Sequence, residues 1–180
     1  AMGFAEESGL PNEMGLIKNQ YTQRTFIQPT QELREQGVRM KLSAVSGVVK
    51  GKRVVMIDDS IVRGTTSARI VTLLRDAGAK EVHMRISSPP FLNPCYYGTD
   101  VDSKDMLIAC HHTLQEITKI IGADSLGYLN IDNLGMLIGA ERGCGYCDAC
   151  FSAAYPTQIP QETNKNRFES KIGKKRGENK

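Results

Sequence analysis

The sequence predicts an α/β domain in which helices flank a parallel β-sheet. Residues 53–57 form a nearly continuous apolar run, which is typical of a strand covered on both faces. A polar, glycine-containing loop follows, and residues 67–77 then carry apolar side chains at helical spacing. Residues 82–86 alternate between apolar and polar side chains, as a second strand does. A strand, a helix and another strand in this order predict a βαβ unit, and therefore parallel pairing.

Length and composition are those of one folded domain. The chain has 180 residues, of which 40% are hydrophobic and 24% charged, and no apolar run approaches the roughly 20 residues of a membrane-spanning helix. The net charge of +3 is unevenly placed, because residues 161–180 hold seven Lys or Arg and three Glu. Residues 1–160 therefore carry a net charge of −1. We expect neither a membrane nor a nucleic acid as partner, and interpret residues 158–180 as a disordered basic tail.

The segments before the βαβ unit predict a helix, a strand and a lid. Residues 1–7 resemble the interior of a helix without the features of a signal peptide, so we expect an N-terminally truncated chain. Residues 14–17 form a short apolar strand. Residues from about 19 to 43 are polar and hold only one short helical pattern, at 31–36. Connections of this length are often flexible lids over an active site.

Beyond the βαβ unit the sequence predicts short helices and a cysteine cluster. Helical patterns cover residues 103–109 and 113–121, and a further segment, 131–138, leads into the cysteines. We expect a domain over residues 1–130, a helical and cysteine-cluster segment over 131–157, and the tail thereafter.

The loop after the first strand of the unit combines two acids with an anion-binding helix start. Asp58 and Asp59 follow the strand at its carboxyl end, where open α/β sheets bind ligands. Gly64 and the hydroxyls from Thr65 to Ser67 stand at a helix N-terminus, which favours a phosphate. Paired carboxylates bind ribose hydroxyls or Mg²⁺. The alternative is a capped helix start with solvated acids, and the spacing matches neither the P-loop nor the dinucleotide fingerprint.

The loop also carries a family resemblance. The sequence Asp58-Asp59-Ser60-Ile61-Val62-Arg63-Gly64-Thr65-Thr66 resembles the phosphoribosyl pyrophosphate (PRPP) signature of type I phosphoribosyltransferases. Other segments resemble the glutamine phosphoribosylpyrophosphate amidotransferases, which catalyse the first committed step of purine synthesis: residues 15–19, 24–29, 31–34, 87–90, 93–98 and 121–126. The resemblance spans about residues 3–156. It implies a type I phosphoribosyltransferase fold with a helical C-terminal extension.

The resemblance implies a role for each residue of this loop, residues 58–67, which we call the PRPP loop. Asp58 and Asp59 would bind the ribose hydroxyls of PRPP and its Mg²⁺. The rest of the site would be Ser60, Arg63, Gly64, Thr65, Thr66 and Ser67, with residues 63–67 on the 5′-phosphate. The lid would supply Arg24 and Lys41 as candidate catalytic residues, and Tyr21 as a further contact.

The implied reaction is attack of ammonia on C1 of PRPP, which gives 5-phosphoribosylamine and pyrophosphate. In this family a glutaminase domain releases the ammonia from glutamine, and this sequence shows no such domain. We therefore expect the 180-residue chain to use no glutamine and to have little transferase activity. The resemblance also implies a cytoplasmic homo-oligomer inhibited by purine nucleotides.

The cysteines predict a soft-metal site. Cys144, Cys147 and Cys150 follow a Cys-x-x-Cys-x-x-Cys pattern, and the count of five in a chain with no secretion signal argues for thiols rather than disulfides. Zinc and a [4Fe–4S] cluster both accept four thiolates, so the spacing leaves both open. The resemblance to the bacterial iron–sulfur subgroup favours a cluster on Cys95, Cys147 and Cys150, with a fourth ligand from upstream. Cys144 is then an extra thiol or a substitute ligand, and we expect Cys110 to pack in the core.

Two other classes of protein share some of these features. A PRPP-sensing regulator would bind PRPP without catalysis and use a basic element on nucleic acid, but the tail lacks interleaved aromatic residues. A competence-type protein would carry its metal module before the two acids, whereas here the cysteine pattern follows them.

Overall fold

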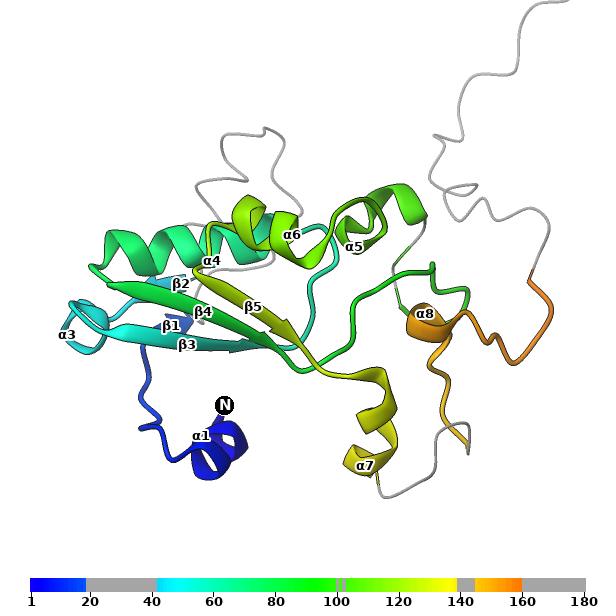
Figure 1. Cartoon of the computed structure of the whole chain (residues 1–180), viewed down its shortest axis with the longest axis horizontal. Helices are drawn as coiled ribbons and strands as arrows, with labels where there is room; N and C mark the ends of the chain where they lie inside the picture. The colour runs from blue at the N-terminus through cyan, green and yellow to red at the C-terminus, as the bar shows by residue number, and fades with distance from the viewer. Residues whose placement is uncertain (19–41, 100, 102, 139–144, 160–180) are drawn as a thin grey trace, which may run out of the picture.

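A parallel sheet with helices on both sides forms the centre of the protein (Figure 1). The computed structural model describes residues 1–18, 42–99, 101, 103–138 and 145–159. The strands β3 (Arg53–Asp58), β4 (Glu81–Ile86) and β5 (Ser125–Tyr128) pair in that order, all parallel. The helix α4 (Thr65–Asp76) joins β3 to β4, and α6 (Leu114–Ile121) precedes β5. This arrangement confirms the predicted α/β class and its βαβ unit.

The hydrophobic core lies between the sheet and α4 with α6. Val82 and Met84 of β4 are fully buried, and the register sets Met84 beside Met56 of β3 and Leu126 of β5. Figure 1 shows α4 and α6 on this face, while α1 (Met2–Ser8) and α7 (Leu134–Ile138) lie on the opposite side. Helices therefore lie on both sides of the sheet, as is usual for parallel strands.

The strand β3 is less buried than its apolar sequence predicts. None of its residues is fully buried, and Arg53 is exposed. The reason is its place in the sheet: within the described residues β3 pairs only with β4, so it forms an edge of that sheet. Its apolar side chains therefore meet neighbours on one flank only.

The N-terminal part forms a second, small sheet. The strand β1 (Leu16–Lys18) pairs antiparallel with β2 (Leu42–Ala44), and α3 (Ser46–Val49) follows. The predicted helix at residues 1–7 corresponds to α1 and the strand at 14–17 to β1. The lid was predicted too long at one end, since residues 42–43 pair with β1; residues 19–41, with the helical pattern at 31–36, lie outside the described residues.

The helix predicted at residues 103–109 is interrupted. A 3₁₀ turn, η2 (Lys104–Met106), is separated from α5 (Ile108–His111) by Leu107 in an extended conformation. Leu107 is fully buried, and the Ile108 amide donates to the carbonyl of Val62, 2.9 Å away. The helix is interrupted at Leu107 because that side chain is buried in the core and because the next amide bonds to the PRPP loop. Three short elements follow β5 in the described part of the chain: η3 (Ile131–Asn133), α7 and α8 (Ala149–Ser152).

Asp124, Arg75 and Val82 form a hydrogen-bonded group, which we call the polar latch. It joins α4 to the amino ends of β4 and β5. Asp124 Oδ2 accepts from the Val82 amide and from Arg75 Nη2, both at 2.6 Å. Arg75, near the end of α4, also donates to the Lys80 carbonyl at 3.1 Å. The Val82 amide bond lowers the pKa of Asp124 and the Arg75 charge adds to it, although partial burial opposes them. The latch therefore holds a carboxylate between α4 and two strands.

No helix within the described ranges has the length and hydropathy to cross a membrane.

Candidate functional site

Two acids stand where β3 ends. Asp58 is the last residue of β3, and its Oδ1 accepts from the Asp59 amide at 3.0 Å. Asp59 Oδ1 in turn accepts from the Ser60 hydroxyl at 2.8 Å. Burial raises the pKa of Asp58, and the charge of Asp59 adds to the rise, while the Asp59 amide bond opposes it. Two neighbouring carboxylates, one of them desolvated, form a donor set that suits a hard divalent cation.

The next strand holds the backbone of Asp58 in place. Ser87, the first residue after β4, donates twice to the Asp58 carbonyl: from its amide at 3.0 Å and from its hydroxyl at 3.1 Å. Ser87 was not among the residues predicted from the sequence to belong to the site. The sequence does contain a signal for it, because Ser87 is the first residue after β4, the strand that pairs with β3.

The second half of the PRPP loop forms an open helix start. Gly64 is the N-cap of α4 with φ +80°, a left-handed conformation that favours glycine, and it supplies no side-chain cap. The first amides of α4 are therefore available to an anion, at the positive end of the helix dipole. Thr65 and Thr66 are exposed beside them, whereas Ser67 is only 2% exposed. Of the three hydroxyl residues, the two threonines present their side chains to a ligand.

Arg63 is exposed next to this helix start, and its Nη2 lies 3.4 Å from Sδ of Met106. The loop thus brings acids, a cation and free amides to one edge of the sheet. The lid residues Tyr21, Arg24 and Lys41 lie outside the described residues.

Two hydroxyls near this edge have no hydrogen-bond partner among the described residues. They are Ser88 Oγ, just after β4, and Tyr128 Oη, at the end of β5; both atoms are buried. Burial raises the pKa of Tyr128 to about 12, so its hydroxyl stays protonated at neutral pH.

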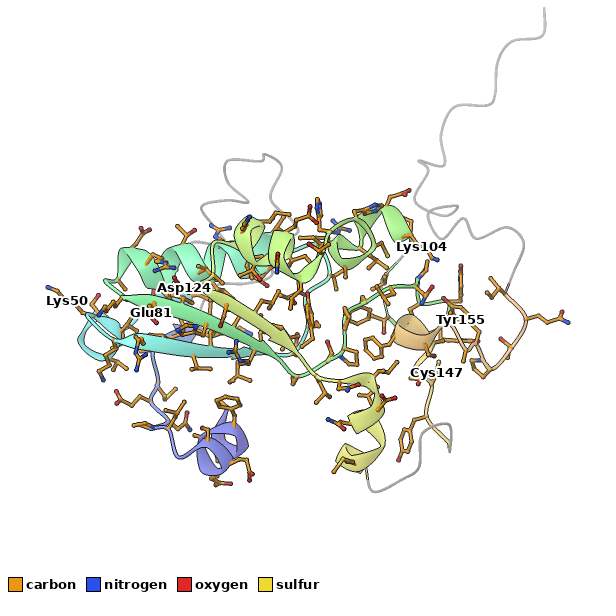
Figure 2. All side chains as sticks on the ribbon, viewed as in Figure 1. Lys50, Glu81, Lys104, Asp124, Cys147 and Tyr155 are labelled. Atoms are coloured by element: carbon orange, nitrogen blue, oxygen red, sulfur yellow. The ribbon has the colours of Figure 1, made fainter. Side chains whose placement is uncertain are left out.

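The chain folds back so that the C-terminal cysteines meet the segment after β4. The carbonyl of Cys150 accepts from the amides of Leu92 and Asn93, each at 3.0 Å, and Tyr155 Oη donates to the Pro94 carbonyl at 2.7 Å. Figure 2 shows Cys147 and Tyr155 beside α8. These contacts bring α8 next to Cys95.

The thiols of this region influence one another. Burial raises the pKa of Cys150 to about 11, and the charges of Cys95 and Cys147 add to the rise. Burial acts in the same direction on Cys95, but bonds from the backbone amides of residues 97–99 outweigh it and lower the pKa of Cys95. None of these three cysteines forms a disulfide, and no three His, Cys, Asp or Glu side chains within the described ranges are arranged to hold a metal ion.

The other two cysteines differ in position. Cys144 lies outside the described residues. Cys110 is half-buried in α5, and its thiol donates to the carbonyl of Leu92 at 3.2 Å. Cys110 lies outside the hydrophobic core, so the predicted core position is wrong; its thiol is held by the bond to Leu92 instead.

An apolar cavity of about 480 Å³ lies elsewhere, between α1 and β3. Its lining includes Phe4, Leu10 and Val55 and reaches Ile57, but none of the PRPP-loop residues contributes to it. Its lining holds a single acid, Glu13, and no acid pair, so we place the functional site at the PRPP loop instead.

An acid pair at the carboxyl end of β3, followed by a glycine-led helix start, defines a type I phosphoribosyltransferase-like domain. Comparison with known proteins supports this class and narrows it. The amidophosphoribosyltransferase of Bacillus subtilis (strain 168) is 61% identical over 166 residues, which are 91% of this chain and 35% of the relative. That of Archaeoglobus fulgidus is 55% identical over 165 residues, 90% of this chain and 36% of the relative.

The fold agrees with the sequences. A solved structure of glutamine phosphoribosylpyrophosphate (PRPP) amidotransferase from B. subtilis, complexed with ADP and GMP, superposes with a TM-score of 0.79 at 61% identity. It matches 91% of this chain, which covers 36% of that one. No protein-family model matches the chain. Over nine tenths of its length this chain is homologous to the amidophosphoribosyltransferases, as the sequence resemblance predicts, and it spans about a third of the length of these curated relatives.

Proposed function

We propose that this chain binds PRPP as the phosphoribosyltransferase part of an amidophosphoribosyltransferase. The observation that carries the proposal is the composition of the PRPP loop, which joins two acids at the end of β3 to the open N-terminus of α4. PRPP bears phosphates at both ends of a ribose, so a ligand of this shape needs an anion site and a hydroxyl or cation site within one loop. Homology at 61% identity supports the same substrate.

The residues divide the binding work between them. The amides at the start of α4, with the hydroxyls of Thr65 and Thr66, bind the 5′-phosphate. Asp58 and Asp59 bind the ribose hydroxyls and the Mg²⁺ that accompanies PRPP; when bound, this ion neutralises charge on the leaving pyrophosphate. Ser87 keeps Asp58 in position through its two bonds to the carbonyl.

The proposed reaction needs positioning more than covalent chemistry. Ammonia forms a bond to C1 of the ribose, the bond from C1 to the pyrophosphate oxygen breaks, and the pyrophosphate leaves with the electron pair. The nitrogen then releases one proton to give the amine. Arg24 and Lys41 of the lid are the candidates for contact with that leaving group. A closed lid would also exclude water, which competes with ammonia for C1.

We propose a soft metal for the cysteine region, either a [4Fe–4S] cluster or zinc. Cys95, Cys147 and Cys150 supply thiolates, and Cys144 is a further ligand candidate. The support is the proximity of three cysteines that form no disulfide, together with the Cys-x-x-Cys-x-x-Cys pattern. Because transfer of a phosphoribosyl group involves no oxidation or reduction, the role would be structural. Iron and sulfide found together in anaerobically purified protein would support a cluster, and stoichiometric zinc without sulfide would replace it with a zinc site.

The whole protein's partners follow from the same proposal. They are ammonia from a glutaminase domain, purine nucleotides as inhibitors, and further copies of the chain in a cytoplasmic oligomer. The B. subtilis protein was solved as a complex with ADP and GMP, which supports nucleotide binding.

Phosphorus NMR tests the proposal directly. With the 180-residue chain and Mg²⁺, both the 5′-phosphate and the pyrophosphate resonances of PRPP should shift or broaden, because both ends contact the protein. A response from the pyrophosphate alone would remove the N-terminus of α4 from the site, and no response from either would refute PRPP binding. Binding by the longer protein without ammonia-dependent release of pyrophosphate would favour the PRPP-sensing regulator instead.

A further inference from the structure

The PRPP loop rests against a segment that the proposed function does not use. This segment, residues 104–111, comprises η2, Leu107 and α5, and we call it the backing segment. It meets the loop at three consecutive positions: it bonds to the Val62 carbonyl and to the Arg63 guanidinium, and at Gly64 it fills the space that a β-carbon would need. Each contact involves a residue on which the placement of the 5′-phosphate would depend.

The third position, Gly64, has no room for a side chain. A β-carbon placed on Gly64 would lie 2.8 Å from Cδ1 of Ile108, nearer than carbon atoms approach without a bond. The next neighbour, Cγ2 of Ile121, would be 3.6 Å away, an ordinary contact distance. Ile108 is 8% exposed and belongs to the core, so it cannot easily move aside. Two features therefore favour glycine at position 64: its left-handed conformation, and the Ile108 methyl group that fills the space a β-carbon would need.

The backing segment also forms hydrogen bonds with the two residues before Gly64. The Ile108 amide donates to the Val62 carbonyl at 2.9 Å, which fixes the direction from which the chain enters Gly64. Met106 Sδ accepts from Arg63 Nη2 at 3.4 Å. A thioether is a weak acceptor and carries no charge, so it orients the guanidinium without neutralising it.

We propose that Ile108 and Met106 are positioning residues for the 5′-phosphate, Ile108 by fixing Gly64 at the start of α4 and Met106 by orienting Arg63. The inference rests on the proposed function, because it assumes that the PRPP loop binds this phosphate. It predicts that changes in the backing segment weaken binding of one end of PRPP and leave the other end unaffected.

The test uses the 180-residue chain and two ligands that separate the ends of PRPP. Ribose 5-phosphate carries only the 5′-phosphate, and magnesium pyrophosphate represents the other end. Calorimetry measures both dissociation constants for the unaltered chain and for Gly64→Ala, Ile108→Val and the double variant. Thermal unfolding of each variant shows that it is folded.

Gly64→Ala should weaken ribose 5-phosphate binding by more than tenfold, since it combines the clash with the left-handed conformation. Ile108→Val removes Cδ1 alone, and in the double variant it should recover at least threefold of that loss. A deficit of about fivefold to thirtyfold should remain, because alanine still adopts the left-handed conformation. Met106→Leu keeps the volume without the acceptor and should weaken ribose 5-phosphate binding by about threefold. Magnesium pyrophosphate should bind all variants equally.

Two results would overturn the inference while the proposed function stands: a double variant that binds no better than Gly64→Ala, or an Ile108 change that weakens both ligands equally. Failure of the unaltered chain to bind ribose 5-phosphate would refute the 5′-phosphate assignment and the inference with it. If that chain bound neither ligand, the proposed function would fail as a whole.

Discussion

Replacing Asp124 with alanine should destabilise the domain by about 1–2 kcal/mol. The substitution removes two hydrogen bonds of 2.6 Å to one carboxylate, from the Val82 amide and from Arg75. Hydrogen bonds to charged groups contribute about 1.5–3 kcal/mol each when buried. Both partners of the ion pair are 35% exposed at the side chain, so solvent screening reduces that figure. For a chain of this size the loss corresponds to a fall in melting temperature of about 2–8 °C.

The pH dependence separates the charge from the packing. The folded-state pKa of Asp124 is lowered, so its stabilising contribution is complete above the unfolded pKa of about 3.9 and is lost as the pH falls through the folded value. Asp124→Asn lacks this titration. The gap in melting temperature between the unaltered chain and Asp124→Asn should therefore be constant from pH 7 to 5 and close below about pH 4.

A matched control is Asp76→Ala, which removes the same charge from an exposed position at the end of α4. It should change stability by less than about 0.5 kcal/mol. Equal melting temperatures for the Asp124 and Asp76 variants would refute the latch as a stabilising element. A gap that persists at pH 2–3 would show that the charge of Asp124 is not its source.

Burial, capping and electrostatics each yield a further prediction. Met84→Ala should lower the free energy of unfolding by about 2–5 kcal/mol in urea titration, because Met84 is fully buried, while Met136→Ala, at 80% exposure, should change it little. Thr113→Ala should cost about 1 kcal/mol in the same assay, since Thr113 caps α6 in a capping box. Because the pKa of Asp58 is raised, protons should displace Mg²⁺ from it at a higher pH than from an ordinary carboxylate. Calorimetry from pH 7 to 4 should show this loss of Mg²⁺ binding. Asp59→Asn removes the neighbouring charge and should move the loss to lower pH.

The βαβ unit could be predicted because local pattern and tertiary structure agree there. The alternation in residues 82–86 matches the buried Val82, Met84 and Ile86, and the polar loop after the apolar run marks the acid pair at the carboxyl end of β3. The spacing of the cysteines indicated a metal site, but the proximity of Cys95 to α8 came only from the family resemblance.

Other features depend on contacts between distant residues. The strand β5 has only four residues, including Gly127. Its position depends on pairing with β4 and on the polar latch at its amino end. The break at Leu107 arises from burial of that side chain and from the bond to Val62, neither of which has a local signal. The partial burial of β3 reflects its place in the sheet rather than its composition.

Titration calorimetry of PRPP on the 180-residue chain, with and without Mg²⁺, is the decisive experiment for PRPP binding at this loop. We expect a single site whose affinity depends on Mg²⁺ and is lost when Asp58 and Asp59 are both replaced by asparagine, with the melting temperature little changed. Equal affinity in the presence and absence of Mg²⁺, or undiminished binding by the double asparagine variant, would contradict the assignment.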